Sequence, residues 1–227
     1  MLKQFRKILI ICAHPDDEVI GCGGTISLMS KKSKVDLLVL TNGEGSRNFN
    51  NKEMNKKIND RKKMLQKSCA NLGIKNFYQE NLNDNELDSY SNLKITKILE
   101  KYIHLLKPDT VFTHHEADLN IDHKKVYQAT VTATRPYKTK FIKNILSFEV
   151  PSSTESQYGK KQFKPNFFVN ISKKIKKKEI SLKIYKNQFS KNISPLNIKY
   201  LINFSKMRGG SVGYKFAEAF EVIRIST

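Results

Sequence analysis

The stretch that decides the fold of this chain lies near its start and reads Ile8-Leu9-Ile10-Ile11-Cys12-Ala13-His14-Pro15-Asp16-Asp17-Glu18. An apolar run of this kind is typical of a central parallel strand that is covered on both faces. The run stops at a histidine, and two adjacent carboxylates and a glycine-rich segment, Gly21-Cys22-Gly23-Gly24, follow it. We therefore expect a buried strand that presents metal-ligand chemistry at one edge of a sheet.

The 227 residues are expected to form one domain, residues 1–227, that is large enough to bury a substantial core. No apolar run approaches the roughly 20 residues that span a bilayer, so no integral membrane segment is expected. The basic start leads into the first strand and not into a cleavage site, which argues against a signal peptide. The odd number of cysteines, all in apolar contexts, favours free thiols and a cytoplasmic location; they are Cys12, Cys22 and Cys69.

The formal net charge of +20 admits two interpretations. Strongly basic chains often bind nucleic acid or anionic membranes. Here the lysines are spread along nearly every predicted helix, and the chain contains no motif that reads RNA or DNA. A solvated, lysine-rich surface is the first interpretation, and attraction of a small anionic substrate, such as a sugar nucleotide or a lipid phosphate, is the second. No nucleic-acid partner is expected, and oligomerisation is left open.

Strands and helices alternate up to residue 150, which predicts an α/β fold with a Rossmann-like, mostly parallel sheet flanked by helices. The C-terminal part is less regular, and residues 151–168 form a polar loop whose length suggests a lid. The expected strands cover residues 7–13, 35–40, 78–82, 110–113, 142–150 and 217–225. The expected helices cover residues 18–31, 52–72, a stretch from its cap at Asn92 to Pro108, a stretch from 122, then 172–189 and 195–206 before a turn at Gly209-Gly210.

Unusual residues stand at the carboxyl ends of these strands, where open α/β sheets bind their ligands. The first strand delivers His14, Asp16 and Asp17, and a later strand delivers the segment from His114 to His123. A catalytic zinc commonly takes three protein ligands and keeps one position for water. His14, one carboxylate of the Asp16-Asp17 pair and one distal histidine would complete that set. The other carboxylate would then be free to act as a general base.

Each of these residues also has a purely structural interpretation. His14 would then be a core histidine bonded to backbone, and the two aspartates would form a turn or a helix cap. One of His114 and His115 is expected to be structural, because both follow directly on a strand. The glycine segment lacks G-x-G-x-x-G spacing and follows two acids that repel a pyrophosphate, which disfavours a dinucleotide site. A non-catalytic, Rossmann-like nucleotide-binding module is the alternative to an enzyme.

Arg61 interrupts the apolar stripe of the helix expected over residues 52–72. A charge on a buried face needs a partner, because removing it from water without one is costly. Two interpretations are open: the side chain extends outward to solvent, or it reaches a site.

The segment Ala13-His14-Pro15-Asp16-Asp17-Glu18, with the Gly-x-Gly-Gly that follows it, resembles the signature of the PIG-L/LmbE-like zinc-dependent N-deacetylases. The resemblance extends over nearly the whole chain and includes Thr41-Asn42-Gly43-Glu44-Gly45, Arg61, Asp84 and Asp118-Leu119-Asn120-Ile121-Asp122-His123. Three further segments are similar to a bacterial subgroup tied to amino-sugar and surface-glycan metabolism: Thr134-Arg135-Pro136, Phe148-Glu149-Val150 and Ala217-Glu218-Ala219-Phe220-Glu221.

The resemblance implies a hydrolase that removes an N-acetyl group from an amino sugar carried by a sugar nucleotide, a glycoconjugate or a glycan precursor. It implies that His14, Asp17 and His123 bind Zn²⁺, with Fe²⁺ as the other metal to consider, and that Asp16 is the general base. This division fits the chemistry, because a ligated carboxylate loses basicity to the metal while its unligated neighbour can take a proton from water. The resemblance also implies substrate-binding roles for Arg61 and Asp84.

Asn120 is a departure from many members of the family, which carry a histidine three residues before the distal zinc ligand and use it to stabilise the oxyanion. A neutral amide can donate a hydrogen bond but cannot transfer a proton. The oxyanion donor is therefore left open between Asn120 and His115. Asp122, next to His123, is expected to cap the following helix or to orient a metal ligand from behind.

Overall fold

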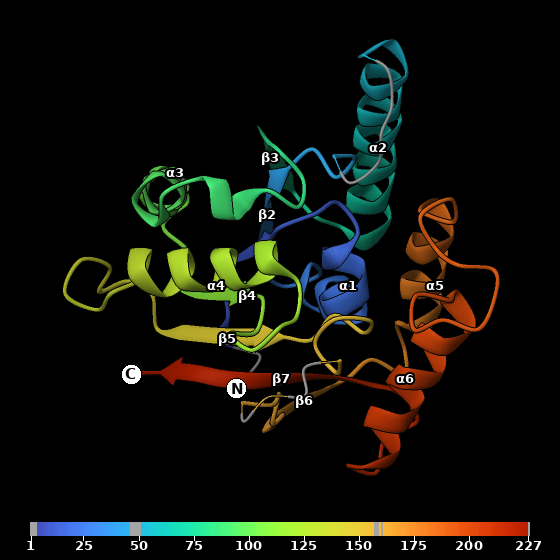
Figure 1. The fold of residues 1–227 in the computed structure, drawn as a ribbon. Coiled ribbons are helices and arrows are strands. Elements are labelled where there is room, and N and C mark those ends of the chain that lie inside the picture. Colours follow the sequence, from blue (N-terminus) through green and yellow to red (C-terminus); the bar gives the residue numbers. More distant parts are fainter. Residues whose placement is uncertain (1–3, 46–50, 157–158, 160, 227) are drawn as a thin grey trace.

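The computed structural model describes residues 4–45, 51–156, 159 and 161–226 (Figure 1). Within these residues, seven strands form one sheet of order β3-β2-β1-β4-β5-β7-β6. The strands are β1 (Lys7–Cys12), β2 (Lys34–Thr41), β3 (Asn76–Leu82), β4 (Thr110–Thr113), β5 (Asn144–Phe148), β6 (Phe167–Asn170) and β7 (Ala217–Ile225). The helices are α1 (Asp17–Met29), α2 (Asn51–Leu72), α3 (Asn92–Leu106), α4 (Ile121–Ala133), α5 (Ile175–Ile184) and α6 (Ile198–Gly210), with a short 3-10 helix η2 (Leu87–Ser89).

The sheet is mostly parallel, which confirms the predicted fold class. β1 pairs in parallel with β2 on one side and with β4 on the other, and β3 and β5 extend the parallel sheet outward. Only the C-terminal strand β7 runs antiparallel, against β5 and β6. The strand order therefore reverses next to β1, and in open α/β sheets such a reversal opens a crevice at the carboxyl ends of the strands.

Alternate side chains of β1 enter two separate cores. Ile8 and Ile10 pack in the core that includes α1, α2 and α5, whereas Leu9 and Ile11 pack in the core that includes α3 and α4. Figure 1 shows these two sets of helices on opposite faces of the sheet. Because both faces of the strand are covered, it is a continuous apolar run and not an alternating one.

The glycines of α1 let this helix lie close to its neighbours. A Cβ added at Gly21 would clash with the ring of Phe148 at the end of β5, and one at Gly24 would lie 2.7 Å from Ile171 Cβ. The close packing places the first turn of α1, with Asp16 and Asp17, directly at the carboxyl end of β1.

The C-terminal part differs from the prediction in three places. β6 lies partly inside the segment 151–168 that was predicted as a lid loop, because it pairs with the distant strand β7; residues 157, 158 and 160 of that segment lie outside the described residues. α5 (Ile175–Ile184) is shorter than the helix expected over residues 172–189, whereas α6 (Ile198–Gly210) begins and ends later than the helix expected over residues 195–206. The predicted Gly209-Gly210 turn is instead the last turn of α6, where a Cβ at Gly209 would lie 2.8 Å from Phe216 Cα.

The structure also corrects the predicted cap of α3 and confirms the predicted state of the cysteines. Ser91, and not Asn92, caps α3, since its Oγ accepts a hydrogen bond from the Lys94 amide at 3.2 Å. The three cysteines are buried and unpaired, as predicted. Among the described residues, no helix combines the length and apolar character needed to cross a membrane.

Candidate metal and active site

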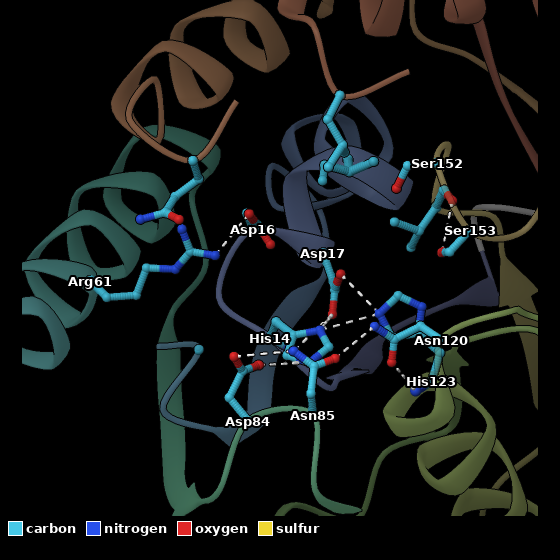
Figure 2. A pocket seen from close by; sticks show the side chains of 15 residues that line it. His14, Asp16, Asp17, Arg61, Asp84, Asn85, Asn120, His123, Ser152 and Ser153 are labelled. Atoms are coloured by element: carbon cyan, nitrogen blue, oxygen red, sulfur yellow. Dashed lines mark hydrogen bonds and ion pairs between the residues drawn. The ribbon is translucent and has the colours of Figure 1, made fainter. Parts of the chain in front are cut away.

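A cavity of about 210 Å³ opens at the carboxyl ends of the parallel strands around β1, where the strand order reverses between β1 and β4 (Figure 2). His14, Asp16 and Asp17 reach it from the turn after β1, and Arg61 reaches it from α2. The loops after β2, β3, β4 and β5, the helix α1 and the segment between α5 and α6 supply the rest of its wall. The remaining lining residues are Ile20, Gly43, Asp84, Asn85, Asn120, His123, Val150, Ser152, Ser153, Gln188 and Leu196.

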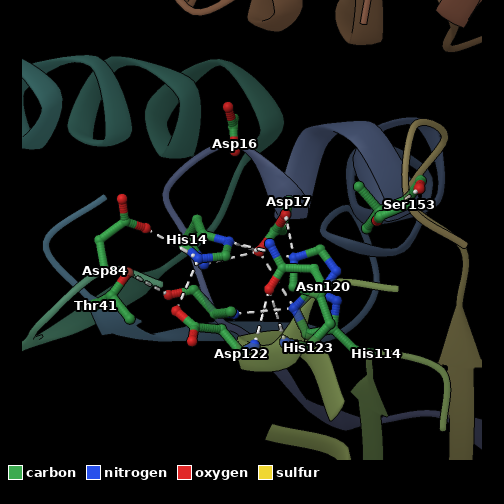
Figure 3. Close-up of polar contacts among 12 residues, drawn as sticks. His14, Asp16, Asp17, Thr41, Asp84, His114, Asn120, Asp122, His123 and Ser153 are labelled. Carbon is green, nitrogen blue, oxygen red and sulfur yellow. Dashed lines mark hydrogen bonds and ion pairs between the residues drawn. The ribbon is translucent and has the colours of Figure 1, made fainter. Parts of the chain in front are cut away.

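Three of the predicted metal ligands converge on one point in this cavity (Figures 2 and 3). His14 Nδ1 lies 3.2 Å from His123 Nε2. The two oxygens of Asp17 lie 3.4 Å from these same nitrogens, Oδ2 from His14 Nδ1 and Oδ1 from His123 Nε2. One atom of each residue can therefore face a single cation, with all three atoms within 4.8 Å of one another. Two imidazole nitrogens and one carboxylate are a common donor set for a catalytic zinc.

A second acidic cluster stands on the other side of the His14 ring. His14 Nε2 lies 3.0 Å from Asp84 Oδ1 and 3.1 Å from Asp122 Oδ2. The oxygens of Asp122 already accept the backbone N–H groups of Asn85 and Leu87, at 2.8 and 2.9 Å. These carboxylates can accept a hydrogen bond from a proton on His14 Nε2. Holding the proton there leaves Nδ1 with its lone pair directed at Asp17 and His123, which is the form that binds a metal.

His123 has a similar support from Asp118. Its Nδ1 lies 3.1 Å from Asp118 Oδ1, as an ion-pair contact outside hydrogen-bond geometry. Asp118 itself accepts hydrogen bonds from the Thr154 hydroxyl at 2.6 Å and from the backbone N–H of Asn120 at 2.9 Å. Sequence reasoning assigned no role to Asp118, although it lies five residues before the predicted distal ligand.

Buried carboxylates set the electrostatics of this point. Burial lowers the pKa of His14, but its contacts with Asp122, Asp17 and Asp84 outweigh burial and raise that pKa well above the usual value. Burial likewise acts against the charged form of His123, yet Asp17 and Asp118 raise its pKa to about 9. The surroundings thus favour positive charge between the two rings. A divalent cation supplies such charge once the ring nitrogens that face it are deprotonated, so the residues present fit a metal ion.

Asp16 stands beside this cluster and has a different environment. Its Oδ2 accepts a hydrogen bond from Arg61 Nη2 at 2.9 Å, and its backbone has the unusual φ of 124°. Burial raises the pKa of Asp16 to about 6, although Arg61 lowers it. Of the two interpretations of Arg61, the structure therefore shows the second, because this side chain is only 4% exposed and reaches the site. Its Nε and Nη1 have no hydrogen-bond partner among the described residues.

The structure distinguishes the two roles that were considered for Asp122, and it gives Asn120 a second one. The cap of α4 is Asn120, whose Oδ1 accepts from the backbone amides of Asp122 and His123 at 2.8 and 3.4 Å. Asp122 does not cap the helix and instead faces His14, as described above. The amide nitrogen of Asn120 reaches Asn85 Oδ1 at 3.3 Å and lines the cavity. The side chain thus keeps a donor on the cavity side.

The two adjacent histidines after β4 lie apart. His114 Nε2 accepts from the Ala13 amide at 2.9 Å, and its ring stacks on His123 with the ring centroids 3.8 Å apart. Burial lowers the pKa of His114 to about 4, so it is a neutral packing residue. His115 Nε2 faces Glu221 at 3.3 Å, and its ring is not among the residues that line the cavity. The structure therefore does not bring His115, one of the two candidate oxyanion donors, to the site.

Four polar lining residues were missed by sequence reasoning, namely Asn85, Ser152, Ser153 and Gln188. They come from loops, and ordinary polar loop residues carry no signal that separates them from their neighbours. A positive φ, seen at Asn85 (57°) and Ser152 (104°), marks two of them, but that feature exists only in the structure.

Comparison with known proteins agrees with the site. The family model described as GlcNAc-PI de-N-acetylase (PIG-L) matches residues 9–134, more than half of the chain. The chain therefore belongs to this family of deacetylases, as the motif around His14 suggested.

Individual relatives are also deacetylases by description. The chain is 28% identical over 175 residues to YaiS, an uncharacterized deacetylase of Escherichia coli, covering 73% of this chain and 82% of the relative. It is 27% identical over 190 residues to a probable N-acetyl-alpha-D-glucosaminyl L-malate deacetylase 2 of Bacillus cereus, covering 81% and 84%. The solved structure of N,N'-diacetylchitobiose deacetylase from Pyrococcus horikoshii shares the fold, with a TM-score of 0.80 at 24% identity over 98% of this chain and 85% of that one.

Proposed function

We propose that this protein hydrolyses the N-acetyl group of an amino sugar, using a zinc ion held by His14, Asp17 and His123 and Asp16 as the general base. The observation that carries the proposal is the convergence of two imidazole nitrogens and one carboxylate on a point beside a second, unligated carboxylate. The family and the amino-sugar relatives support the reaction and the class of substrate.

The donor set supports zinc over a hard cation such as Mg²⁺, because imidazole nitrogens suit zinc and iron whereas Mg²⁺ is bound through oxygen. When bound, the metal supplies a Lewis acid that lowers the pKa of a coordinated water towards about 7. His14 and His123 are oriented for this task by the carboxylates behind them, Asp122 with Asp84 for the first and Asp118 for the second.

In the proposed reaction Asp16 moves the proton. It accepts a proton from the attacking water and later donates it to the departing nitrogen, so that the amide and water become a free amine and acetate. The Arg61 contact at 2.9 Å orients this carboxylate towards the cavity. Asn120 Nδ2 is the remaining candidate donor for the oxyanion of the tetrahedral intermediate, since His115 faces Glu221.

The sugar occupies the rest of the cavity, with Arg61 and Asp84 on one wall and Ser152 and Ser153 on the opposite wall (Figure 2). The guanidinium of Arg61, which lines the cavity, favours a substrate with oxygen acceptors or negative charge close to the acetamide. The net charge of +20 would attract the same anionic substrates over a longer range. The three free thiols fit a reducing compartment such as the cytoplasm.

The test is acetate release from a panel of N-acetylated substrates: free N-acetyl amino sugars, their nucleotide conjugates and lipid-linked glycan precursors. We expect release that stops on treatment with a chelator and returns when zinc is added back. Sugar nucleotides should react faster than the neutral sugars, and added salt should narrow that difference. Full activity after complete metal removal would reject the proposed mechanism.

The nucleotide-binding alternative receives no support from the site. The carboxylates of Asp16, Asp17 and Asp84 line the cavity. These acids repel a phosphate that lies among them, as that alternative requires, and the helix that starts there carries acidic residues in its first turn. The proposed substrate puts its acetamide, and not its phosphates, among these acids.

A further inference from the structure

Glu18 is a buried carboxylate that the proposed reaction does not use. It lies in the first turn of α1, is fully inaccessible to solvent and does not line the cavity. Its Oε1 accepts from the Ser68 hydroxyl at 2.8 Å and from the Tyr185 hydroxyl at 2.9 Å. Its Oε2 accepts from the backbone N–H of Asp16 at 2.9 Å. The carboxylate therefore joins α1, α2 and the end of α5 to the main chain of the proposed general base.

The Asp16 backbone has a reason to need such a partner. Its φ of 124° is a backbone conformation that residues other than glycine rarely adopt. Conformations of this kind persist only where the surrounding structure holds them, and they concentrate at active sites. The hydrogen bond from Asp16 N–H to Glu18 is a contact that acts directly on this backbone.

The side chain of Asp16 is tied to the same group from its other end. Arg61 Nη2 donates to Asp16 Oδ2, and the Arg61 guanidinium lies 5.4 Å from the centre of the Tyr185 ring. Tyr185 in turn donates to Glu18. The contacts form a closed ring that runs from Asp16 to Arg61, Tyr185, Glu18 and back to Asp16. These residues come from α1 with its cap, from α2 and from the end of α5. Only Asp16 and Arg61 of these four line the cavity.

We propose that Glu18 and Tyr185 are positioning residues that fix the Asp16 carboxylate in the geometry required for proton transfer. The inference rests on the proposed function, because it takes Asp16 as the general base. Glu18 acts on Asp16 through the main chain, and Tyr185 acts through both Glu18 and Arg61. Neither residue touches the substrate, so their loss should slow the chemical step without weakening substrate binding.

The test uses Tyr185→Phe, which removes the hydroxyl and keeps the ring beside Arg61. We expect kcat to fall on the order of tenfold, since a small displacement of a catalytic group is costly in rate. KM should stay within about twofold, and the zinc content and melting temperature should match those of the wild type. Tyr102→Phe is the matched control, because it removes a hydroxyl that bonds Glu80, away from the cavity, and should leave kcat unchanged.

A second pair of variants tests Glu18 itself. Glu18→Gln keeps an oxygen that can accept from the Asp16 N–H and should retain most of kcat, whereas Glu18→Ala removes the acceptor and should lose more than Tyr185→Phe does. A Tyr185→Phe enzyme with unchanged kcat overturns the inference while the wild type still releases acetate. The inference is also overturned if kcat of Tyr185→Phe falls only in proportion to a loss of bound zinc or of folded protein. A wild type that releases no acetate from the whole panel instead rejects the proposed function, and the positioning role with it.

Discussion

Asp16 and Asp17 are adjacent in the chain, yet their surroundings separate them. Burial raises the pKa of Asp16 to about 6. Asp17 is also buried, but His123 holds its pKa well below the usual range. Asp17 is thus kept ionised among the imidazoles, and the pKa of Asp16 is high enough for it to exchange protons near neutral pH. Two carboxylates with opposite shifts are a common arrangement for dividing binding from proton transfer.

The first prediction concerns that division. Asp16→Asn should lower kcat by roughly 10² to 10⁴, since the amide cannot accept the proton of water. The zinc content should remain one per chain, because Asp16 is not among the three converging residues. Steady-state kinetics and metal analysis of the same sample check both statements. His14→Ala is the contrasting variant and should lose the metal together with the activity; an Asp16→Asn enzyme of full activity would assign the base elsewhere.

At the scale of elements, α1 is the part on which the site depends. Its first turn presents the acidic residues at the carboxyl end of β1, and its glycines allow contact with β5 and with Ile171. A buried ion pair between Lys178 and Glu218, 2.6 Å long, lies against the same helix, where Glu218 also accepts from the amides of Gly24 and Thr25. The position of the proposed ligands is therefore set by packing on both sides of α1.

The second prediction tests this packing. Gly24→Ala should lower the free energy of unfolding by about 1 to 3 kcal/mol, because the new methyl group would overlap the stiff, fully buried side chain of Ile171. Gly210→Ala is the control in α6, where a Cβ meets nothing within 4 Å. The control should be neutral or up to about 1 kcal/mol stabilising, as expected for alanine in a helix. Urea denaturation measures both, and equal effects would contradict the close approach.

At the scale of the whole molecule, the site is an assembly of distant segments. His14 and Asp17, two of the proposed ligands, follow β1, and the third, His123, lies at the start of α4. Arg61 comes from α2, and Asp84 follows β3. Figure 1 shows these elements meeting around the central strands. A metal ion at this point would join segments more than one hundred residues apart in the chain, so it should stabilise the fold as well as serve the reaction.

The third prediction follows from that linkage. A ligand at a hundred times its dissociation constant adds about 2.7 kcal/mol of stability, which for a chain of this size raises the melting temperature by roughly 5 to 10 °C. We expect a shift of that size between chelator-treated and zinc-loaded protein in a thermal scan. The His14→Ala variant should melt at the same temperature in both conditions. A wild type that is insensitive to zinc would argue against binding at this site.

The sequence by itself determined the fold class and named the three residues, His14, Asp17 and His123, that the structure brings together on one point. Continuous apolar runs followed by helical periods are local patterns, and they predict a buried parallel sheet wherever both faces are covered. The placement of His14, Asp17 and His123 followed from strand ends and a motif, since both are properties of short segments. Their roles, and that of Asp16, remain predictions that the variants above test.

Only the tertiary structure decided what lies behind and around these residues. It placed Asp118 and Asp122 behind the two histidines, gave the helix cap to Asn120 and turned His115 towards Glu221. It also formed β6 from a segment expected to be a loop and joined Glu18 to Tyr185 across 167 positions of chain. These contacts pair residues far apart in sequence, and their energies depend on burial and on the neighbouring elements. No local pattern encodes such pairings, because each exists only once the chain has folded.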